Sequence, residues 1–410
     1  MENDFYNSIV VSDTMAYLAN GRRGLGLINV AQPETPTFAG DIQALGYPNG
    51  VVDLAVIGTM IYYPDGDLLG IVDASNPLSP TSGYVNEIMY NPAAVAAAGH
   101  YVYLVSNRGL STQTWGMHIF DASDPLNAQY VGGFFSPPEK PPFRVVVSGK
   151  YAYLFGSNDK VGNVGLTLVD ITNPMTPTQV GYYETPNNVQ DIAVVGNLAF
   201  IVDGGLHIVR LSNPATSVVE AGLYNPLGAA YSRIAVRGNR AYILDILDGL
   251  HVLDVSEPAF PFEVGFYPVE QGRDVTVDRN DNVYVVTRDS LFILRFAPPS
   301  TMILPGGGSL TSASDTTTYV FPAATFTEAV FVTHTARLTG NVLQTGSLAD
   351  IGHMFGVNAV YSNTGQSARP TAGKGYTLTV HFTEAETRAV RKDSLALYYW
   401  DLKLRYSNMR

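Results

Sequence analysis

A repeated phrase constrains the fold of this chain more than any other feature of its sequence. Two or three apolar residues, usually followed by Asp, lead into a short polar stretch and a proline, as in Leu168-Val169-Asp170 with Asn173-Pro174. The prolines of the seven copies stand at positions 33, 77, 125, 174, 214, 258 and 299, so the spacings are 44, 48, 49, 40, 44 and 41 residues. A period of about 40 to 50 residues that carries several short strands is typical of a radial repeat.

The composition favours an all-β protein. Of the 410 residues, 46% are hydrophobic and 15% are charged, with 39 Gly, 25 Pro, 25 Tyr and 18 Phe, which suits many short strands joined by tight turns. A net charge of -12 without a run of Lys or Arg disfavours a nucleic-acid partner. Because the chain has no cysteine, disulfides, thiolate zinc sites and thiol nucleophiles are excluded.

One repeat can be divided into four strands. The sequence predicts strands over 191–195, 198–202, 206–210 and 218–224, with Gly196-Asn197 and Asp203-Gly204 as turn signals. Four antiparallel strands form one blade of a β-propeller. The second strand recurs in step with the prolines, as Ala16-Tyr17, Ile61-Tyr62, Val102-Tyr103, Ala152-Tyr153, Ala199-Phe200, Ala241-Tyr242 and Val283-Tyr284.

The phrases over residues 166–174 and 249–258 resemble the LVIVD repeat, which is associated with bacterial, often surface-exposed β-propellers. The resemblance covers residues 8 to 297 and implies a seven-bladed β-propeller that serves as a scaffold, without a catalytic motif. It also implies an extracellular or cell-surface location. No signal peptide and no 18-residue apolar run is visible, so a cytoplasmic location is the alternative to a lost start.

A second domain is expected after the repeats. The prediction divides the chain into a propeller over 1–297, a linker over 298–309 and a small β-sandwich over 310–410. Alternating segments over 317–321, 329–335, 376–382 and 394–400 are its expected strands. The phrases at 321–326 and 395–401 resemble an accessory domain of bacterial surface proteins, which usually continues further, so a truncated C-terminus is expected.

The seventh blade contains only three predicted strands. Its third strand runs from Leu291 to Phe296, and no fourth follows. Propellers commonly close when the N-terminal segment supplies the outer strand. Because few residues precede Ser8, either the closure is short or upstream residues are missing from this chain.

Aligning the blades on their turn glycines gives one ring position at the start of each innermost strand. Because innermost strands line the channel of a propeller, these side chains should gather at one mouth and could hold a polar ligand or an ion. The alternative is that Asp ties neighbouring blades through backbone amides and that the arginines pair with it. The ring consists of Ser8, Asp53, Ala94, Arg144, Asp191, Arg233 and Asp274.

Three long loops point to the same face as this ring. They span 107–116, 156–165 and 136–143, and would form a rim with Arg108, Trp115, Lys140 and Lys160 as ligand-binding candidates. Tolerated loop insertion is the alternative.

Other motifs are interpreted as structural. His118, His207 and His251 occupy one repeat position in different blades, about 10 Å apart or more, so they cannot share a metal ion. Asp278, Asn280 and Asn282 have the spacing of a calcium loop, but Val283 stands where that loop needs Gly. Ser157 and Lys160 match a Ser-x-x-Lys pattern within a polar loop. The Asp of the repeat phrase is expected to accept backbone amides in its turn. No metal and no cofactor is predicted.

The sequence therefore predicts a non-catalytic binding or scaffold module that meets a protein or carbohydrate partner on the propeller face. The competing class is a hydrolase or lyase that uses Asp53, Asp191 or Asp274 as acid or base at the channel mouth.

Overall fold

The structure is a computed structural model that describes residues 6–43, 50–85, 90–108, 115–136, 142–155, 165–213, 217–226, 228–296, 300–312, 316–337, 354–362, 368–381, 398–399 and 407–408. Within these residues the only helical element is a short 3-10 helix, η1 (Pro125–Asn127). The chain divides into two compact units, one of Met1–His251, Val255–Pro261 and Tyr267–Arg295, the other of Val252–Asp254, Phe262–Phe266 and Phe296–Arg410.

The repeats form antiparallel sheets in which strands follow one another in chain order. The first sheet contains β1 (Ser8–Ser12), β2 (Met15–Ala19), β3 (Leu25–Asn29) and β4 (Thr37–Ile42). The second contains β5 (Ala55–Ile57), β6 (Met60–Asp65), β7 (Leu68–Asp73) and β8 (Thr81–Val85). The third contains β9 (Tyr90–Ala98), β10 (Tyr101–Arg108), β11 (Trp115–Asp121) and β12 (Gln129–Ser136).

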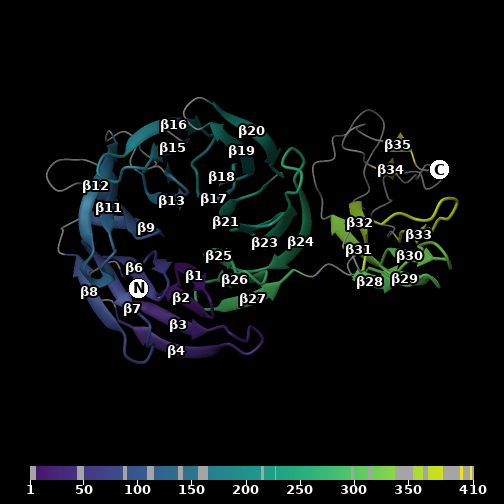
Figure 1. Cartoon of the computed structure of the whole chain (residues 1–410), viewed down its shortest axis with the longest axis horizontal. Coiled ribbons are helices and arrows are strands. Elements are labelled where there is room, and N and C mark those ends of the chain that lie inside the picture. Colours follow the sequence, from purple (N-terminus) through teal and green to yellow (C-terminus); the bar gives the residue numbers. More distant parts are fainter. Residues whose placement is uncertain are drawn as a thin grey trace. The chain divides into compact units, whose positions relative to one another are not determined.

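Four more sheets continue the pattern. They consist of β13 (Arg144–Ser148), β14 (Tyr151–Phe155), β15 (Gly165–Asp170) and β16 (Thr178–Glu184); β17 (Asp191–Val195), β18 (Leu198–Val202), β19 (Leu206–Asn213) and β20 (Ser217–Tyr224); β21 (Tyr231–Arg237), β22 (Arg240–Asp245), β23 (Gly249–Asp254) and β24 (Phe262–Pro268); and β25 (Asp274–Val277), β26 (Asn282–Val286) and β27 (Leu291–Arg295). The sheets are arranged in a ring, with β1, β9, β13, β17, β21 and β25 innermost (Figure 1).

The repeated second strand forms the core between sheets. Tyr153 and Phe200 are almost fully buried, and the alanines that precede them, Ala152 and Ala199, have no exposed surface. A large ring beside a small or branched residue fills the space between two sheets that converge toward the channel. Burial of both side chains is the physical reason why a small or branched residue followed by an aromatic ring recurs in every repeat.

The proline turn of the following sheet packs against a glycine in the outermost strand of the preceding sheet. The sequence prediction missed this contact. A Cβ added to Gly132 or Gly222 would overlap the carbonyl oxygen of Pro174 or Pro258, respectively. At Gly40 the Pro77 carbonyl oxygen would lie 3.1 Å away. The ladders of β4, β12, β16 and β20 shift register next to their glycines, as at a β-bulge. Proline turn and glycine therefore form an outer joint between successive sheets.

The last sheet pairs three strands among the described residues, in the order β25-β26-β27. It packs against the first sheet, where Ile9 and Leu18 form one buried cluster with Tyr284 and Val286. The N–H of Tyr6 donates to the carbonyl of Arg288 at 3.3 Å. First and last sheets are thus joined although β27 has no outer partner in the described part of the chain.

The second unit contains two three-stranded sheets that share a core. One orders β28 (Ser300–Ile303), β31 (Val330–Arg337) and β32 (Met354–Tyr361); the other orders β29 (Gly308–Thr311), β30 (Thr318–Phe321) and β33 (Thr377–Thr379); β34 (Tyr398–Tyr399) pairs β35 (Ser407–Asn408). Ile303 and Val332 of the first sheet pack with Tyr319 and Phe321 of the second. A linker was predicted over 298–309, but β28 and the first two residues of β29 lie within this range.

The alternation predicted for residues 376–382 is found over 377–380 only, because Tyr376 is 41% exposed and Phe382 lies outside the described residues. Leu378 packs against the core of this unit, whereas Thr377 and Thr379 are exposed. In the described residues no helix is long and apolar enough to cross a membrane.

Candidate functional site

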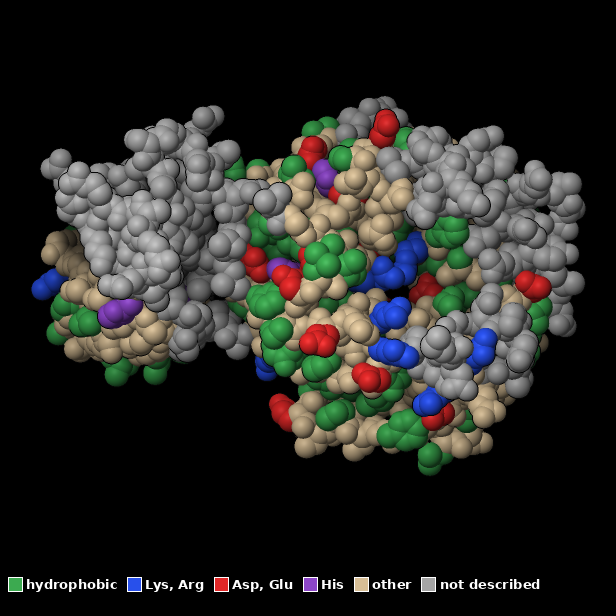
Figure 2. Space-filling model, turned by 180° about the vertical axis from the view of Figure 1, so that it is seen from behind, with side chains coloured by type: hydrophobic (Ala, Val, Ile, Leu, Met, Phe, Trp, Pro, Cys, Tyr) green, Lys and Arg blue, Asp and Glu red, His purple; other side chains and the backbone are tan. Residues whose placement is uncertain are grey.

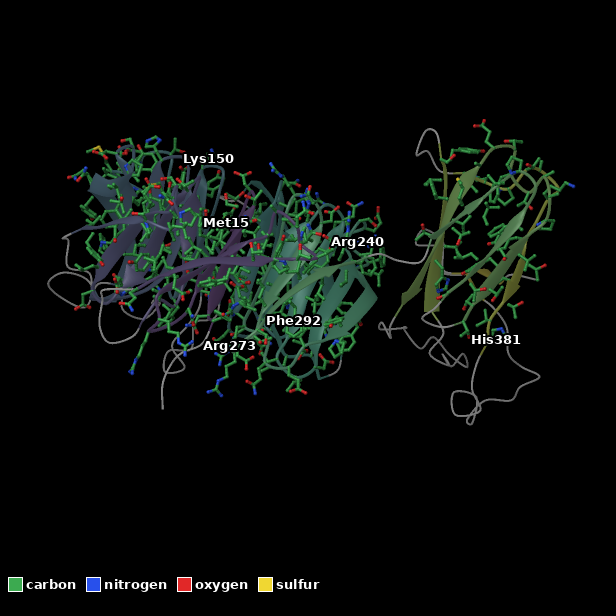
Figure 3. The ribbon with its side chains drawn as sticks, turned by 90° about the horizontal axis from the view of Figure 1, so that it is seen from below. Met15, Lys150, Arg240, Arg273, Phe292 and His381 are labelled. Atoms are coloured by element: carbon green, nitrogen blue, oxygen red, sulfur yellow. The ribbon has the colours of Figure 1, made fainter. Side chains whose placement is uncertain are left out.

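The predicted ring residues lie at one end of the innermost strands. Ser8, Asp191 and Asp274 begin β1, β17 and β25, Arg144 begins β13, and the other ring residues lie just before or inside β5, β9 and β21. We call this side of the propeller the mouth face; Arg273, next to the ring, lies on it, whereas Lys150, in a turn between a first and a second strand, lies on the opposite face (Figure 3). Figure 2 shows a hollow in the middle of the ring of sheets, with basic and acidic side chains around it.

The three aspartates of the ring bind backbone amides of the next sheet. Asp53 Oδ2 accepts from the N–H of Val95 at 3.0 Å, and Asp191 Oδ2 accepts from the N–H of Ile234 at 2.9 Å. Each donor is the residue directly after the ring position of the following sheet. The carboxylates therefore act as inner joints between sheets, as the structural alternative proposed.

Asp274 forms the same joint between the last and the first sheet. Its Oδ2 accepts from the N–H of Ile9 at 2.9 Å and from the hydroxyl of Ser8 at 2.8 Å, while its Oδ1 accepts from the N–H of Val275 at 2.9 Å. Residues separated by 265 positions in the chain are joined in this way.

The mouth changes the acidity of these carboxyl groups. Burial raises the pKa of Asp191 to about 6, although Arg233 and Arg144 oppose this shift. Burial also raises the pKa of Asp53, and Arg144 again opposes it. Loss of hydration disfavours the charged form more than the nearby guanidinium groups restore it.

Arg144 and Arg233 are half-buried and close enough to act electrostatically on Asp191, but they do not pair with the aspartates as expected. In the described residues no guanidinium nitrogen of either arginine lies within 4.0 Å of a carboxylate oxygen. The expectation that the ring arginines pair with the aspartates is therefore wrong, because the aspartates accept hydrogen bonds from backbone amides instead.

The predicted rim lies mainly outside the described residues. Lys140 and Lys160 fall outside them, as do residues 109–114, 137–141 and 156–164. Arg108 ends β10 opposite Tyr90, and Trp115 begins β11 opposite Ser136, so these two backbone positions reach the mouth face.

Each of the three repeat histidines bonds within its own sheet. His118 Nε2 lies 2.9 Å from Ser106 Oγ, and burial lowers the pKa of this histidine to about 4. His207 lies 3.3 Å from Asp203 and 3.0 Å from Glu220, and hydrogen bonding to Asp203 raises its pKa. The partners stand at the end of the neighbouring strand or beside it, a pairing that the sequence prediction missed.

One group in the described part of the chain could supply three metal ligands, and the prediction of no metal site overlooked it. Ligand atoms of Asp245, Asp248 and His251 lie within 4.8 Å of one another. However, Asp245 already accepts the N–H groups of Ala230 and Leu247, each at 2.8 Å, and His251 Nε2 lies 2.9 Å from Asp248 Oδ1. These contacts account for the cluster as a hydrogen-bonded hairpin turn.

The calcium-like spacing belongs to a hairpin turn. Asp278 Oδ1 accepts from the N–H groups of Asn280 and Asn282, and its Oδ2 accepts from the Tyr284 hydroxyl at 3.0 Å. Asp281, between Asn280 and Asn282, has a left-handed backbone conformation with a φ of 63°. The carboxylate thus organises the turn that leads into β26.

The repeat aspartates accept amides in their turns, as predicted. Asp73 and Asp170 each accept the N–H two residues ahead at 2.8 Å. The bond from the Ser75 N–H lowers the pKa of Asp73, and bonds from the Thr172 side chain and N–H lower the pKa of Asp170. Ser157 and Lys160 of the Ser-x-x-Lys pattern lie outside the described residues.

Comparison with known proteins agrees with this architecture. Residues 50–83, 143–185, 186–225 and 228–269 match the LVIVD repeat family. The structure of U3-55K is similar with a TM-score of 0.58 at 12% identity, covering 72% of this chain and 97% of that one. The WD40 repeats of RRP9 have a TM-score of 0.58 at 12% identity, covering 72% and 96%. None of the curated proteins compared with the chain matches its sequence.

Such low identity establishes the fold alone. The chain is an all-β repeat protein with a β-propeller fold, and a fold by itself does not define a function.

Proposed function

We propose that this chain is a non-catalytic binding or scaffold module that meets a protein or carbohydrate partner on the mouth face. In this proposal its first unit is a seven-bladed propeller, its second unit is a small β-sandwich, and it works on the surface of a bacterial cell or outside it. The resemblance to surface-exposed LVIVD proteins supports the location.

One observation carries the proposal: all three acidic ring residues accept backbone N–H groups. For Asp53, Asp191 and Asp274 the acceptor bonds reach the next sheet, so these carboxylates hold the propeller together. A general acid or base has to exchange its proton with a substrate, and a carboxylate engaged by amides is poorly placed for this. The net charge of -12 also disfavours nucleic acid as the partner.

The test compares the two faces of the propeller. The full chain is screened against a glycan array and a displayed protein-fragment library, and each ligand found is titrated against two double variants. Trp115→Ala with Lys140→Ala alters the rim that the sequence predicts for the mouth face, where Trp115 begins β11. Leu78→Ala with Met175→Ala alters the opposite face, where these side chains are 87% and 70% exposed.

We expect the mouth-face variant to weaken binding by roughly tenfold or more, as loss of an aromatic anchor typically does. The opposite-face variant should bind as the parent does. Loss of affinity in the opposite-face variant, with the mouth-face variant unaffected, would overturn the proposal.

A hydrolase or lyase is the second candidate, and one observation favours it. A carboxyl group with a pKa of about 6, as in Asp191, is suited to proton transfer near neutral pH. Turnover of ester, glycoside and uronate substrates is therefore measured for the parent chain and for Asp191→Asn. Activity that disappears in the variant would establish catalysis, whereas a binding module shows no turnover in either protein.

A further inference from the structure

Two guanidinium groups, those of Arg144 and Arg233, lie at the channel mouth without an ion-pair partner among the residues that the structure describes. Arg144 and Arg233 occupy equivalent ring positions of the fourth and sixth sheets, on either side of the sheet that carries Asp191. Burial and the charge of Arg144 lower the pKa of Arg233, which means that the two cations act on each other. Keeping like charges close in a half-buried place is costly unless an anion compensates them.

The hydrogen-bonding capacity of both arginines is largely unused in the described residues. The side chain of Arg144 makes no hydrogen bond or ion pair there. Arg233 donates from Nη1 to the Ser232 carbonyl at 2.7 Å, while its buried Nε has no hydrogen-bond partner. A guanidinium carries five N–H donors in a planar fork, and a buried donor without a partner is unfavourable.

The aspartates of the ring are engaged by the joints between sheets. Asp191 and Asp53 bind Ile234 and Val95 of the neighbouring sheets, and Asp274 binds Ile9. Their charges are fixed near the arginines but directed at amides. The same ring position therefore carries aspartates that join sheets in some repeats and arginines at the channel mouth in others.

We propose that Arg144 and Arg233 together bind a carboxylate group at the mouth of the channel. This inference rests on the proposed binding function and names the chemistry of that site. Two planar guanidinium forks match the two oxygens of a carboxylate. A singly charged anion is favoured over a phosphate dianion, because three aspartates surround the site and repel the additional charge.

Binding should be linked to uptake of a proton. The charged groups that act on Asp191 are Arg233, Arg144 and Asp274, and a bound anion adds a further negative charge beside them. That charge raises the pKa of Asp191 above its value of about 6 in the free protein. Affinity for a carboxylate should therefore increase as the pH falls from 7.5 to 5.5.

The experiment is calorimetric titration of the full chain with lactate, with the blocked peptide acetyl-Gly-Glu-Gly-amide and with inorganic phosphate. The same titrations use Arg144→Gln and Arg233→Gln, with Arg295→Gln as the matched control, because Arg295 is exposed on the outer strand β27. Circular dichroism melts establish that each variant is folded. Arg144→Lys, which keeps the charge and loses the fork, replaces any variant that does not fold.

We expect saturable binding of a carboxylate probe that weakens roughly tenfold or more in either Gln variant and is unchanged in Arg295→Gln. Tighter binding of lactate would assign the site to a free small carboxylate, and tighter binding of the peptide would assign it to an acidic side chain of a partner protein. Parent-chain affinity should rise toward pH 5.5.

The proposal is overturned if neither carboxylate probe saturates, if phosphate binds more tightly than both, or if both Gln variants keep the parent affinity. Affinity that falls toward pH 5.5 would also overturn it. None of these results affects the comparison of the two faces with Trp115→Ala and Lys140→Ala, so failure of the carboxylate site is distinguishable from failure of the proposed function.

Discussion

At the scale of single residues, one repeated position carries two different tasks. Asp191 accepts the N–H of Ile234 in the next sheet, whereas the side chain of Arg233, at the equivalent position there, donates among the described residues only to the adjacent Ser232 carbonyl. The repeat pattern predicted that both side chains lie at the channel mouth. It could not predict which of them is engaged, because this depends on an amide from a residue more than 40 positions away.

Removing the acceptor at Asp191 should loosen one joint. We expect Asp191→Ala to lower the free energy of unfolding by about 1–3 kcal/mol, since the buried N–H of Ile234 loses its partner. Asp191→Asn keeps an acceptor oxygen and should lose much less. Urea denaturation of both variants, with the exposed Asp41→Ala as control, checks this, and equal losses in the Ala and Asn variants would contradict it.

The raised pKa of Asp191 also predicts a pH dependence of stability. Its carboxyl has a pKa of about 6 in the folded chain and about 3.9 when unfolded. Between these values the folded state holds a proton that the unfolded state has released, so this group's contribution to stability falls as the pH rises from about 4 to about 6.

The stability difference between the parent chain and Asp191→Asn isolates this contribution, because Asn does not titrate. Urea denaturation at pH 4, 5, 6 and 7 should show the variant gaining stability relative to the parent as the pH rises. A difference that stays constant over this range would contradict the assignment.

At the scale of elements, successive sheets are held by an inner and an outer joint. The inner joint is the carboxylate-to-amide bond, and the outer joint places a proline turn against a glycine of the preceding outer strand, as with Pro258 and Gly222. The prolines were visible in the sequence as a period. The partner glycines were not identified, because their role depends on how closely one sheet approaches the next.

Gly222→Ala should test the outer joint. The added methyl group would overlap the Pro258 carbonyl, and overpacking of this kind typically costs about 1–3 kcal/mol. Gly26→Ala is the matched control, because its Cβ would meet nothing closer than 3.7 Å. Chemical denaturation should show a clear loss for the first variant and a small change for the second; similar losses would argue against the joint.

At the scale of the whole molecule, Asp274 joins the two ends of the propeller unit. It binds Ser8 and Ile9 of β1, while β27 has no outer strand partner in the described part of the chain. Closure therefore relies on the inner joint and on the buried cluster around Ile9 and Tyr284.

Asp274→Ala should consequently destabilise the chain more than Asp53→Ala. Both substitutions remove an inter-sheet amide acceptor, but only Asp274 closes a loop of 265 residues and also holds the Ser8 hydroxyl. Urea denaturation gives the comparison, and limited trypsin digestion should cleave the Asp274 variant faster near its N-terminus. A larger loss in Asp53→Ala would refute this role.

The sequence by itself determined the repeat, the all-β class, the order of strands within each repeat and the equivalent ring positions near the starts of the innermost strands. These properties follow from period and alternation, which are local. Only the tertiary structure decided which ring residues bind amides, which histidine meets which partner, and which glycines receive a proline turn. Such choices depend on distances of a few ångströms between sheets, and a repeat pattern specifies the succession of sheets without specifying those distances.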